Sequence, residues 1–178
     1  MMTATTQLVS VRGQDVRVAV RRGTGTRPPL LLCNGIGASL ELLAPFVAAL
    51  DPAIDVISFD VPGVGGSPNP RVPYNFPLLA WFLGQLLDEL GYADQDVDVF
   101  GISWGGALAQ QFALQHPRRC RRLVLVATAT GSLMVPASLN VLRKMADQRR
   151  YRDPEYARSI AGEIYGGRSE ERRVGKEC

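Results

Sequence analysis

The spacing of apolar residues follows a strand-like period of two at the start of the chain. Val9 and Val11 alternate with polar residues, and residues 16–20 repeat the pattern after Gly13. This predicts two short strands joined by a tight turn. The unbroken apolar run 30–33 is typical of a strand that is buried on both faces.

Two later segments change to the longer period of a helix. Residues 40–50 and residues 78–90 place leucine and phenylalanine at helical spacing. Pro45 lies inside the first segment, so the regular helix is expected to begin near it. Asn75 can start the second helix and Gly91 can end it.

Strand-like and helix-like segments then alternate along the chain. The runs IDVISFD, VDVF and LVLVATA predict strands, and WGGALAQQFALQH predicts a helix that ends at Pro117. This order predicts an α/β fold, with a mostly parallel sheet and flanking helices. Ligand sites in such sheets lie beyond the carboxyl ends of the strands. The glycine-containing loops at these ends are Asn34–Gly37, Pro62–Gly66 and Gly101–Gly106.

The alternation stops after Gly131, where a segment richer in Met, Arg and Tyr begins. We therefore expect residues 1–132 to form the alternating core and residues 133–167 to form helices with loops. Residues 168–178, RSEERRVGKEC, are almost entirely charged or polar. They also match the translation of a common sequencing adapter. The native sequence is thus expected to end at Gly167, and a genuine charged tail is the alternative.

Composition narrows the classes of function. With 178 residues, 46% of them hydrophobic, the chain can bury the core of one globular domain. A net charge of +3 gives no argument for nucleic acid, although the arginines within 118–122 are either a solvated helix end or a patch for an anionic surface. Signal-peptide and transmembrane runs are absent, which predicts a cytoplasmic protein. The three cysteines lack the spacing of a disulfide framework or metal site.

The sequence Gly-Ile-Ser-Trp-Gly places Ser103 between a predicted strand and a predicted helix. A serine nucleophile in this position sits on a strained turn, and the residues two before and two after it crowd together. Gly101 and Gly105 would relieve that crowding, and Gly106 would let the helix pack closely. The alternative is an ordinary glycine-rich turn.

An oxyanion formed by attack on an ester needs two backbone N–H donors. Trp104 directly follows Ser103 and would supply one of them. Ile36, in the loop Asn34–Gly37, is the best candidate for the other. Gly35 and Gly37 would let that loop approach the substrate, and Asn34 would either hold the loop by a hydrogen bond or serve only as a turn residue. Asp60 and its neighbouring glycines are expected to shape the adjacent turn without taking part in the chemistry.

The base that a serine nucleophile requires is missing from the chain. Its single histidine, His116, lies at the far end of the helix after Ser103, about 20 Å away at the usual rise. We therefore interpret His116 as a helix C-terminal residue. Carboxylates that follow Ser103 are Asp147, Asp153, Glu155 and Glu163, and none of them follows a predicted strand. An acid and a histidine of a triad are thus both absent as matched elements.

Four stretches together resemble one known family. They are CNGIGASLELLAPFVAALDP, VISFDVPGVGGSPNPRVPY, GISWGGALAQQFALQHPRRCRRLVLVATATG and IYGG. They are similar to the intracellular polyhydroxyalkanoate depolymerases, particularly those acting on medium-chain-length polyesters, over almost all of residues 7–167. The resemblance implies an α/β-hydrolase fold, no cofactor, and hydrolysis of 3-hydroxyalkanoate esters at storage granules. It also implies that residues 133–167 begin the helical cap that this family inserts before its last strands.

The resemblance assigns roles to the residues already singled out. Ser103 carries over as the nucleophile, and Ile36 and Trp104 carry over as oxyanion donors. Serine at this position argues against the related polyester synthases, which use cysteine, and against dehalogenases and epoxide hydrolases, which use aspartate.

Three functions follow as hypotheses. The first is a serine polyester depolymerase, the second is an esterase or lactonase for small soluble esters, and the third is a granule-binding protein without catalysis. Because the triad is incomplete, the 178-residue chain itself is expected to be inactive or nearly so. Its LVLVATA strand is expected to form an unpaired sheet edge with exposed apolar surface.

Overall fold

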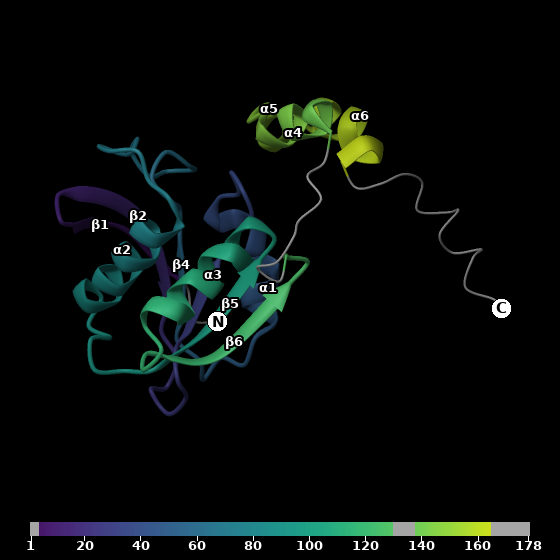
Figure 1. Ribbon diagram of the computed structural model, residues 1–178. Coiled ribbons are helices and arrows are strands. Elements are labelled where there is room, and N and C mark those ends of the chain that lie inside the picture. Colours follow the sequence, from purple (N-terminus) through teal and green to yellow (C-terminus); the bar gives the residue numbers. More distant parts are fainter. Residues whose placement is uncertain (1–3, 130–137, 165–178) are drawn as a thin grey trace. The chain divides into compact units, whose positions relative to one another are not determined.

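The computed structural model describes residues 4–129 and 138–164 (Figure 1). The chain divides into two compact units, residues 1–132 and residues 133–178, and each is described by itself. The sequence-based expectation for the charged tail at 168–178 lies outside the described residues.

The first unit is built on a six-stranded sheet with the order β1-β2-β4-β3-β5-β6. Its strands are β1 (Thr5–Val11), β2 (Gln14–Arg21), β3 (Leu30–Cys33), β4 (Val56–Phe59), β5 (Val97–Ile102) and β6 (Cys120–Val126). Strands β1, β2 and β4 pair antiparallel, whereas β3 pairs in parallel with both β4 and β5, and β5 pairs in parallel with β6. The predicted α/β fold with a mostly parallel sheet is thus confirmed.

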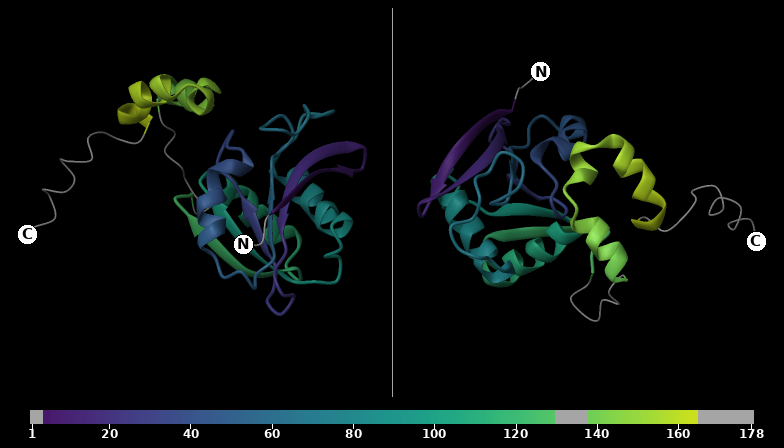
Figure 2. Two further views of the ribbon diagram at one scale, coloured as in Figure 1. Left: turned by 180° about the vertical axis from the view of Figure 1, so that it is seen from behind. Right: turned by 90° about the horizontal axis from the view of Figure 1, so that it is seen from above.

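The helices of this unit begin where their capping residues predict. They are a 3₁₀ turn η1 (Leu40–Leu43) and the helices α1 (Ala44–Ala49), α2 (Phe76–Glu89) and α3 (Trp104–Gln115). Helix α1 starts beside Pro45. The Asn75 side chain accepts a hydrogen bond of 2.9 Å from the N–H of Leu78, and Gly91 follows α2 with a φ of 85°. Helices α2 and α3 lie on one face of the sheet and α1 on the other (Figures 1 and 2).

The hydrophobic core lies between the sheet and the pair α2 and α3. Leu83, Leu86 and Leu87 of α2 are fully buried, as are Leu108 and Phe112 of α3. The helix stripe predicted from the sequence is therefore the stripe that packs on the sheet. This packing holds α3, and with it the turn at its N-terminus, in a fixed position.

Strand β6 forms one edge of the sheet. Within the described residues it pairs only with β5, and Leu123–Val126 remain 37–48% exposed. The expectation of an apolar edge strand is confirmed. The opposite edge is β1, so the six strands leave room for further strands only beyond these two edges.

Two of the four arginines within 118–122 have side-chain partners in the first unit. Arg119 donates to the carbonyls of Gly84 and Tyr92, and Arg121 pairs with Asp98 at 2.5 Å. These contacts tie the start of β6 to α2 and β5, which favours a helix end over a patch for an anionic surface.

The second unit is helical in its described part. It contains α4 (Leu139–Ala146), α5 (Arg149–Arg152) and α6 (Pro154–Ile164). Three of its acidic residues are engaged locally: Asp147 pairs with Arg149, Asp153 accepts from the N–H of Glu155, and Glu163 pairs with Lys144. None of them follows a strand. Across the described parts of the chain, no helix combines the length and the apolar character that crossing a membrane requires.

Candidate active site

Ser103 occupies the turn that joins β5 to α3. Its φ is 53° and its ψ is −119°, a conformation that is strained for a residue other than glycine. The Ser103 N–H donates to the carbonyl of Val126 at 2.9 Å, and the Ser103 carbonyl accepts from Gly106 at 2.9 Å. The end of β6 and the first turn of α3 thus hold this conformation, which is the conformation that a nucleophile elbow requires.

Three glycines make the turn sterically possible. A Cβ on Gly101 would lie 2.6 Å from the carbonyl oxygen of Gly105, and a Cβ on Gly105 would lie 2.1 Å from the carbonyl oxygen of Cys33. A Cβ on Gly106 would meet Thr128 at 2.5 Å. The backbone of α3 therefore lies directly against β5, the end of β3 and the segment after β6.

Replacing Gly105 by alanine should destabilise the fold strongly. The new methyl group meets the backbone of Cys33 and Asn34, which cannot rotate away as a side chain could. We expect a loss of about 2–3 kcal/mol of unfolding free energy, measured by urea denaturation. The matched control is Gly162→Ala in α6, where a Cβ meets nothing within 4 Å and should be neutral or stabilising. Equal effects of the two substitutions would contradict the packing argument.

The candidate oxyanion donors lie next to Ser103. Trp104 is the first residue of α3, where backbone N–H groups have no partner within the helix. In the loop after β3, a Cβ on Gly35 would lie 4.0 Å from the Cβ of Ser103, so this backbone runs beside the serine. Ile36 follows with its side chain 38% exposed, and Gly37 has a φ of 67°. The structure thus brings together the two segments that the sequence singled out.

Asn34 has a direct contact within its own loop. Its side-chain nitrogen donates to the carbonyl of Ser39 at 2.9 Å, which favours a loop-holding role over that of a simple turn residue. The Oδ1 atom of Asn34 is buried and has no hydrogen-bond partner among the described residues.

Asp60 connects the loops at the site, and sequence reasoning gave it only a turn-shaping role. The carboxylate is completely buried and accepts from the N–H of Leu40 at 2.7 Å and of Gly66 at 2.9 Å. Arg17 of β2 donates to the same carboxylate at 3.1 Å, and Ser67 donates to the Asp60 carbonyl at 2.6 Å. One buried carboxylate therefore joins the loop after β3, the loop after β4 and strand β2.

Arg17 also has a partner on the surface. It donates to Glu41 at 2.6 Å, and this hydrogen bond lowers the pKa of Glu41 to about 2. The guanidinium is thus oriented by one buried and one exposed carboxylate, which keeps its charge beside Asp60.

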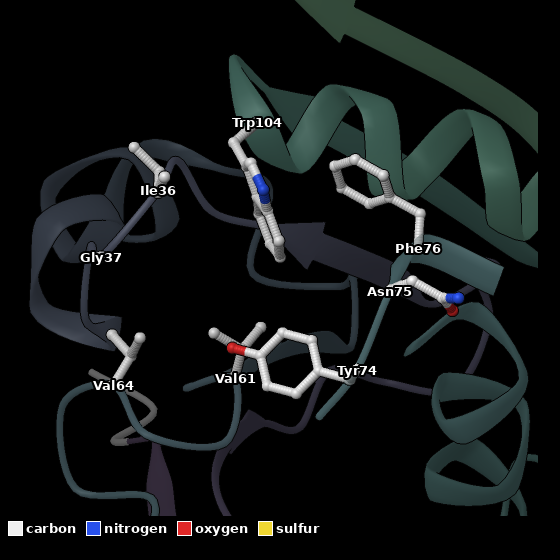
Figure 3. Close-up of a pocket in the computed structure, with 8 residues that line it drawn as sticks. All are labelled: Ile36, Gly37, Val61, Val64, Tyr74, Asn75, Phe76 and Trp104. Carbon is white, nitrogen blue, oxygen red and sulfur yellow. The ribbon is translucent and has the colours of Figure 1, made fainter. Parts of the chain in front are cut away.

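A hollow of about 440 Å³ opens beside the candidate oxyanion donors (Figure 3). Figure 3 shows Trp104 reaching into it from α3, across from Tyr74. The Trp104 and Phe76 rings are 5.0 Å apart, and the Tyr74 hydroxyl donates to the Pro62 carbonyl at 3.0 Å. Burial raises the pKa of Tyr74, so its hydroxyl stays protonated. The lining residues are Ile36, Gly37, Val61, Val64, Tyr74, Asn75, Phe76 and Trp104.

This hollow suits an apolar acyl group. Its walls are chiefly aliphatic and aromatic side chains, and its volume falls in the range of small-molecule sites. Ser103 is not among the lining residues, but it directly precedes Trp104, and the backbone of Gly35 runs beside it. The sequence motifs did not single out Tyr74 or Phe76. The signal that could have found them is that these two aromatic residues flank the Asn75 cap.

The described residues supply no base for Ser103. Its hydroxyl has no hydrogen-bond partner among them, and His116 lies at the other end of α3. There the His116 Nε2 is 3.1 Å from the Ala80 carbonyl and the ring packs on Phe112. Cys33, at the end of β3, is no substitute nucleophile, because burial raises the pKa of its thiol to about 12. No group of three or more potential metal ligands occurs in the described part of the chain.

Comparison with known proteins places this geometry in a family. Residues 28–168 match the family model described as alpha/beta hydrolase fold. The chain belongs to the α/β-hydrolase family. Over 159 residues this α/β-hydrolase chain is 55% identical to a poly(3-hydroxyalkanoate) depolymerase of Ectopseudomonas oleovorans, covering 89% of the chain and 56% of that protein. The resemblance that the motifs indicated is thus confirmed, and the chain spans about half the length of this curated relative.

Solved structures superpose on this chain and share its fold. A bacterial membrane phospholipase A superposes with a TM-score of 0.73 at 23% identity, covering 89% of this chain and 51% of its own. The enol-lactonase from Burkholderia xenovorans LB400 superposes with a TM-score of 0.68 at 27% identity, covering 87% of this chain and 57% of its own. Because the identity to the phospholipase A is only 23%, that comparison shows a shared fold and nothing more. In both cases the likeness covers little more than half of the solved chain.

Proposed function

We propose that this chain is the N-terminal part of a serine hydrolase that cleaves the ester bonds of poly(3-hydroxyalkanoates). The observation that carries the proposal is the strained Ser103 turn, with the Gly35–Gly37 loop beside it and an apolar hollow at Trp104. The similarity to a poly(3-hydroxyalkanoate) depolymerase supports the choice of substrate.

In this mechanism Ser103 attacks the ester carbonyl and forms an acyl-enzyme. The N–H groups of Trp104 and Ile36 stabilise the negative charge that develops on the carbonyl oxygen. The alcohol portion leaves with the proton that Ser103 gives up, and water then attacks the acyl-enzyme to release the acid and return a proton to the serine. No cofactor or metal is required, and the apolar hollow holds the acyl portion.

The proposal also covers the acid and the histidine that a serine nucleophile needs as partners. We propose that the acid and the histidine come from the part of the protein that corresponds to the uncovered length of its relative. On this basis residues 133–167 are the start of the cap, and the 178-residue chain alone is inactive. The place of action is the surface of a polyester granule in the cytoplasm.

The test compares the hydrolysis of two substrates by the complete gene product that contains this chain. We expect hydrolysis of both poly(3-hydroxyoctanoate) particles and p-nitrophenyl octanoate, measured by acid release and by absorbance. Good turnover of the short ester with none of the polymer would reject the depolymerase. That result would favour the esterase or lactonase alternative, to which the likeness to the enol-lactonase points. Binding to the particles without turnover of either substrate would favour a granule-binding protein.

A further inference from the structure

A second hollow lies outside the candidate active site. It has a volume of about 280 Å³ and is bounded by the β1–β2 turn, the loop before α2 and the outer face of α2. Its floor includes the buried Val11 and Phe82, whereas Val72 and Trp81 on its walls are 60% and 43% exposed. Large exposed apolar side chains that gather around one hollow mark a binding surface.

This hollow adjoins the first one. Tyr74 lines both of them, and its hydrogen bond to the Pro62 carbonyl fixes the ring between them. Val61 lines the first hollow and Pro62 the second, just as Phe76 lines the first and Leu78 the second. The two hollows therefore lie on either side of Tyr74.

The charged groups at the second hollow are hydrogen-bond donors, whereas the Gln14 amide oxygen accepts from the Arg71 backbone N–H. Arg12 and Arg71 line it, and no aspartate or glutamate is among its described lining residues. Arg12 donates to the Gln85 side chain. The Arg71 guanidinium has no hydrogen bond or ion pair with any described residue, so its donors are available. An aliphatic polyester has the complementary chemistry, because it carries hydrocarbon side chains and carbonyl acceptors but no donors along its length.

We propose that the hollow lined by Val72, Trp81 and Arg71 is a second substrate subsite, which binds the polyester chain as it extends from the catalytic hollow past Tyr74. The proposal rests on the proposed function, and it assigns this surface to the polymer alone. A short ester fills only the first hollow, so the second contributes to polymer hydrolysis and leaves small-ester hydrolysis unchanged.

The test uses three single variants of the complete gene product. Trp81→Ala and Val72→Glu alter the apolar walls. Arg71→Gln removes an exposed guanidinium that has no hydrogen bond or ion pair with the described residues, so it remains informative if a wall variant folds poorly. The matched control is Leu114→Glu on α3, a side chain that is 75% exposed and lines neither hollow.

Each wall variant is expected to lower the rate on poly(3-hydroxyoctanoate) particles by roughly tenfold, the effect typical of losing a central interface side chain. Arg71→Gln is expected to lower it by about threefold, within the range for one hydrogen bond of ordinary strength. For p-nitrophenyl octanoate, kcat/KM should stay within about twofold for all variants, and Leu114→Glu should match the wild type on both substrates. Cosedimentation with the particles should weaken in parallel.

Three results would overturn the subsite. The first is wild-type polymer hydrolysis by all three variants while Ser103→Ala is inactive. The second is an equal loss on polymer and short ester, with a lowered melting temperature, since the hollow would then be covered by the rest of the chain. The third is a wild-type protein that does not attack the polymer at all. This last result also removes the proposed function, whereas the first two leave it standing.

Discussion

Substituting alanine for Ser103 in the complete gene product should abolish ester hydrolysis. The hydroxyl is the group that we propose to form the acyl-enzyme, and no described neighbour can replace it, because His116 is held by Ala80 and Phe112 and Cys33 is a buried thiol. We expect kcat to fall by roughly 10⁴-fold or more. The residual rate would come from the oxyanion donors and from binding.

Two further measurements separate loss of the nucleophile from loss of the fold. A fluorophosphonate probe should label the wild-type protein and leave Ser103→Ala unlabelled, while both proteins unfold at the same temperature. The matched control is Ser159→Ala, an exposed serine on α6 whose hydroxyl, among the described residues, donates only to the Tyr156 carbonyl. The isolated 178-residue chain should label no faster than Ser103→Ala. Rapid labelling of that chain would contradict the proposal that its base lies in the uncovered length.

Asp60→Ala should cost more stability than any other removal of a polar side chain near the site. Its carboxylate accepts from Leu40, Gly66 and Arg17, and all of these donors lose their partner at once. Removing one member of a buried charged network costs about 3–5 kcal/mol. Urea denaturation should show this loss, and ester hydrolysis should fall as well, since the loops on both sides of the site lose their common anchor.

Glu41→Gln is the matched control for this experiment. Glu41 pairs with the same Arg17, but its side chain is 62% exposed. Removing an exposed partner costs only up to about 1 kcal/mol. If Asp60→Ala proved as mild as Glu41→Gln, the buried carboxylate would not be the anchor of these loops.

Local patterns in the chain were enough to predict most of its elements. Alternation in 16–20 and the apolar run at 30–33 predicted strands, and Asn75 and Pro45 marked where helices begin, because strand periodicity, helix caps and proline geometry are properties of short segments. The strand-to-helix position of Ser103 followed from the same local signals. The sequence also predicted that His116 lies far from Ser103, because the number of helical residues between them gives their separation directly.

The residues that line the hollow beside Trp104 could not be predicted from such local patterns. Tyr74, Phe76 and Val61 lie far from Trp104 in the sequence and meet it only because α2 and α3 pack on the same face of the sheet. The role of Asp60 was likewise invisible, since its partners Arg17 and Leu40 come from different elements. A buried carboxylate and a turn aspartate look the same along a sequence, and only burial and partners distinguish them.

The sequence alone therefore determined the order of elements, the family resemblance and the place of the candidate nucleophile. These depend on residues that are close along the chain. The tertiary structure alone decided that Gly105 touches the end of β3, that Asp60 joins the loops around the site, and that Tyr74 separates two hollows. These facts arise from contacts between distant segments, which form when helices bury their apolar stripes against the sheet.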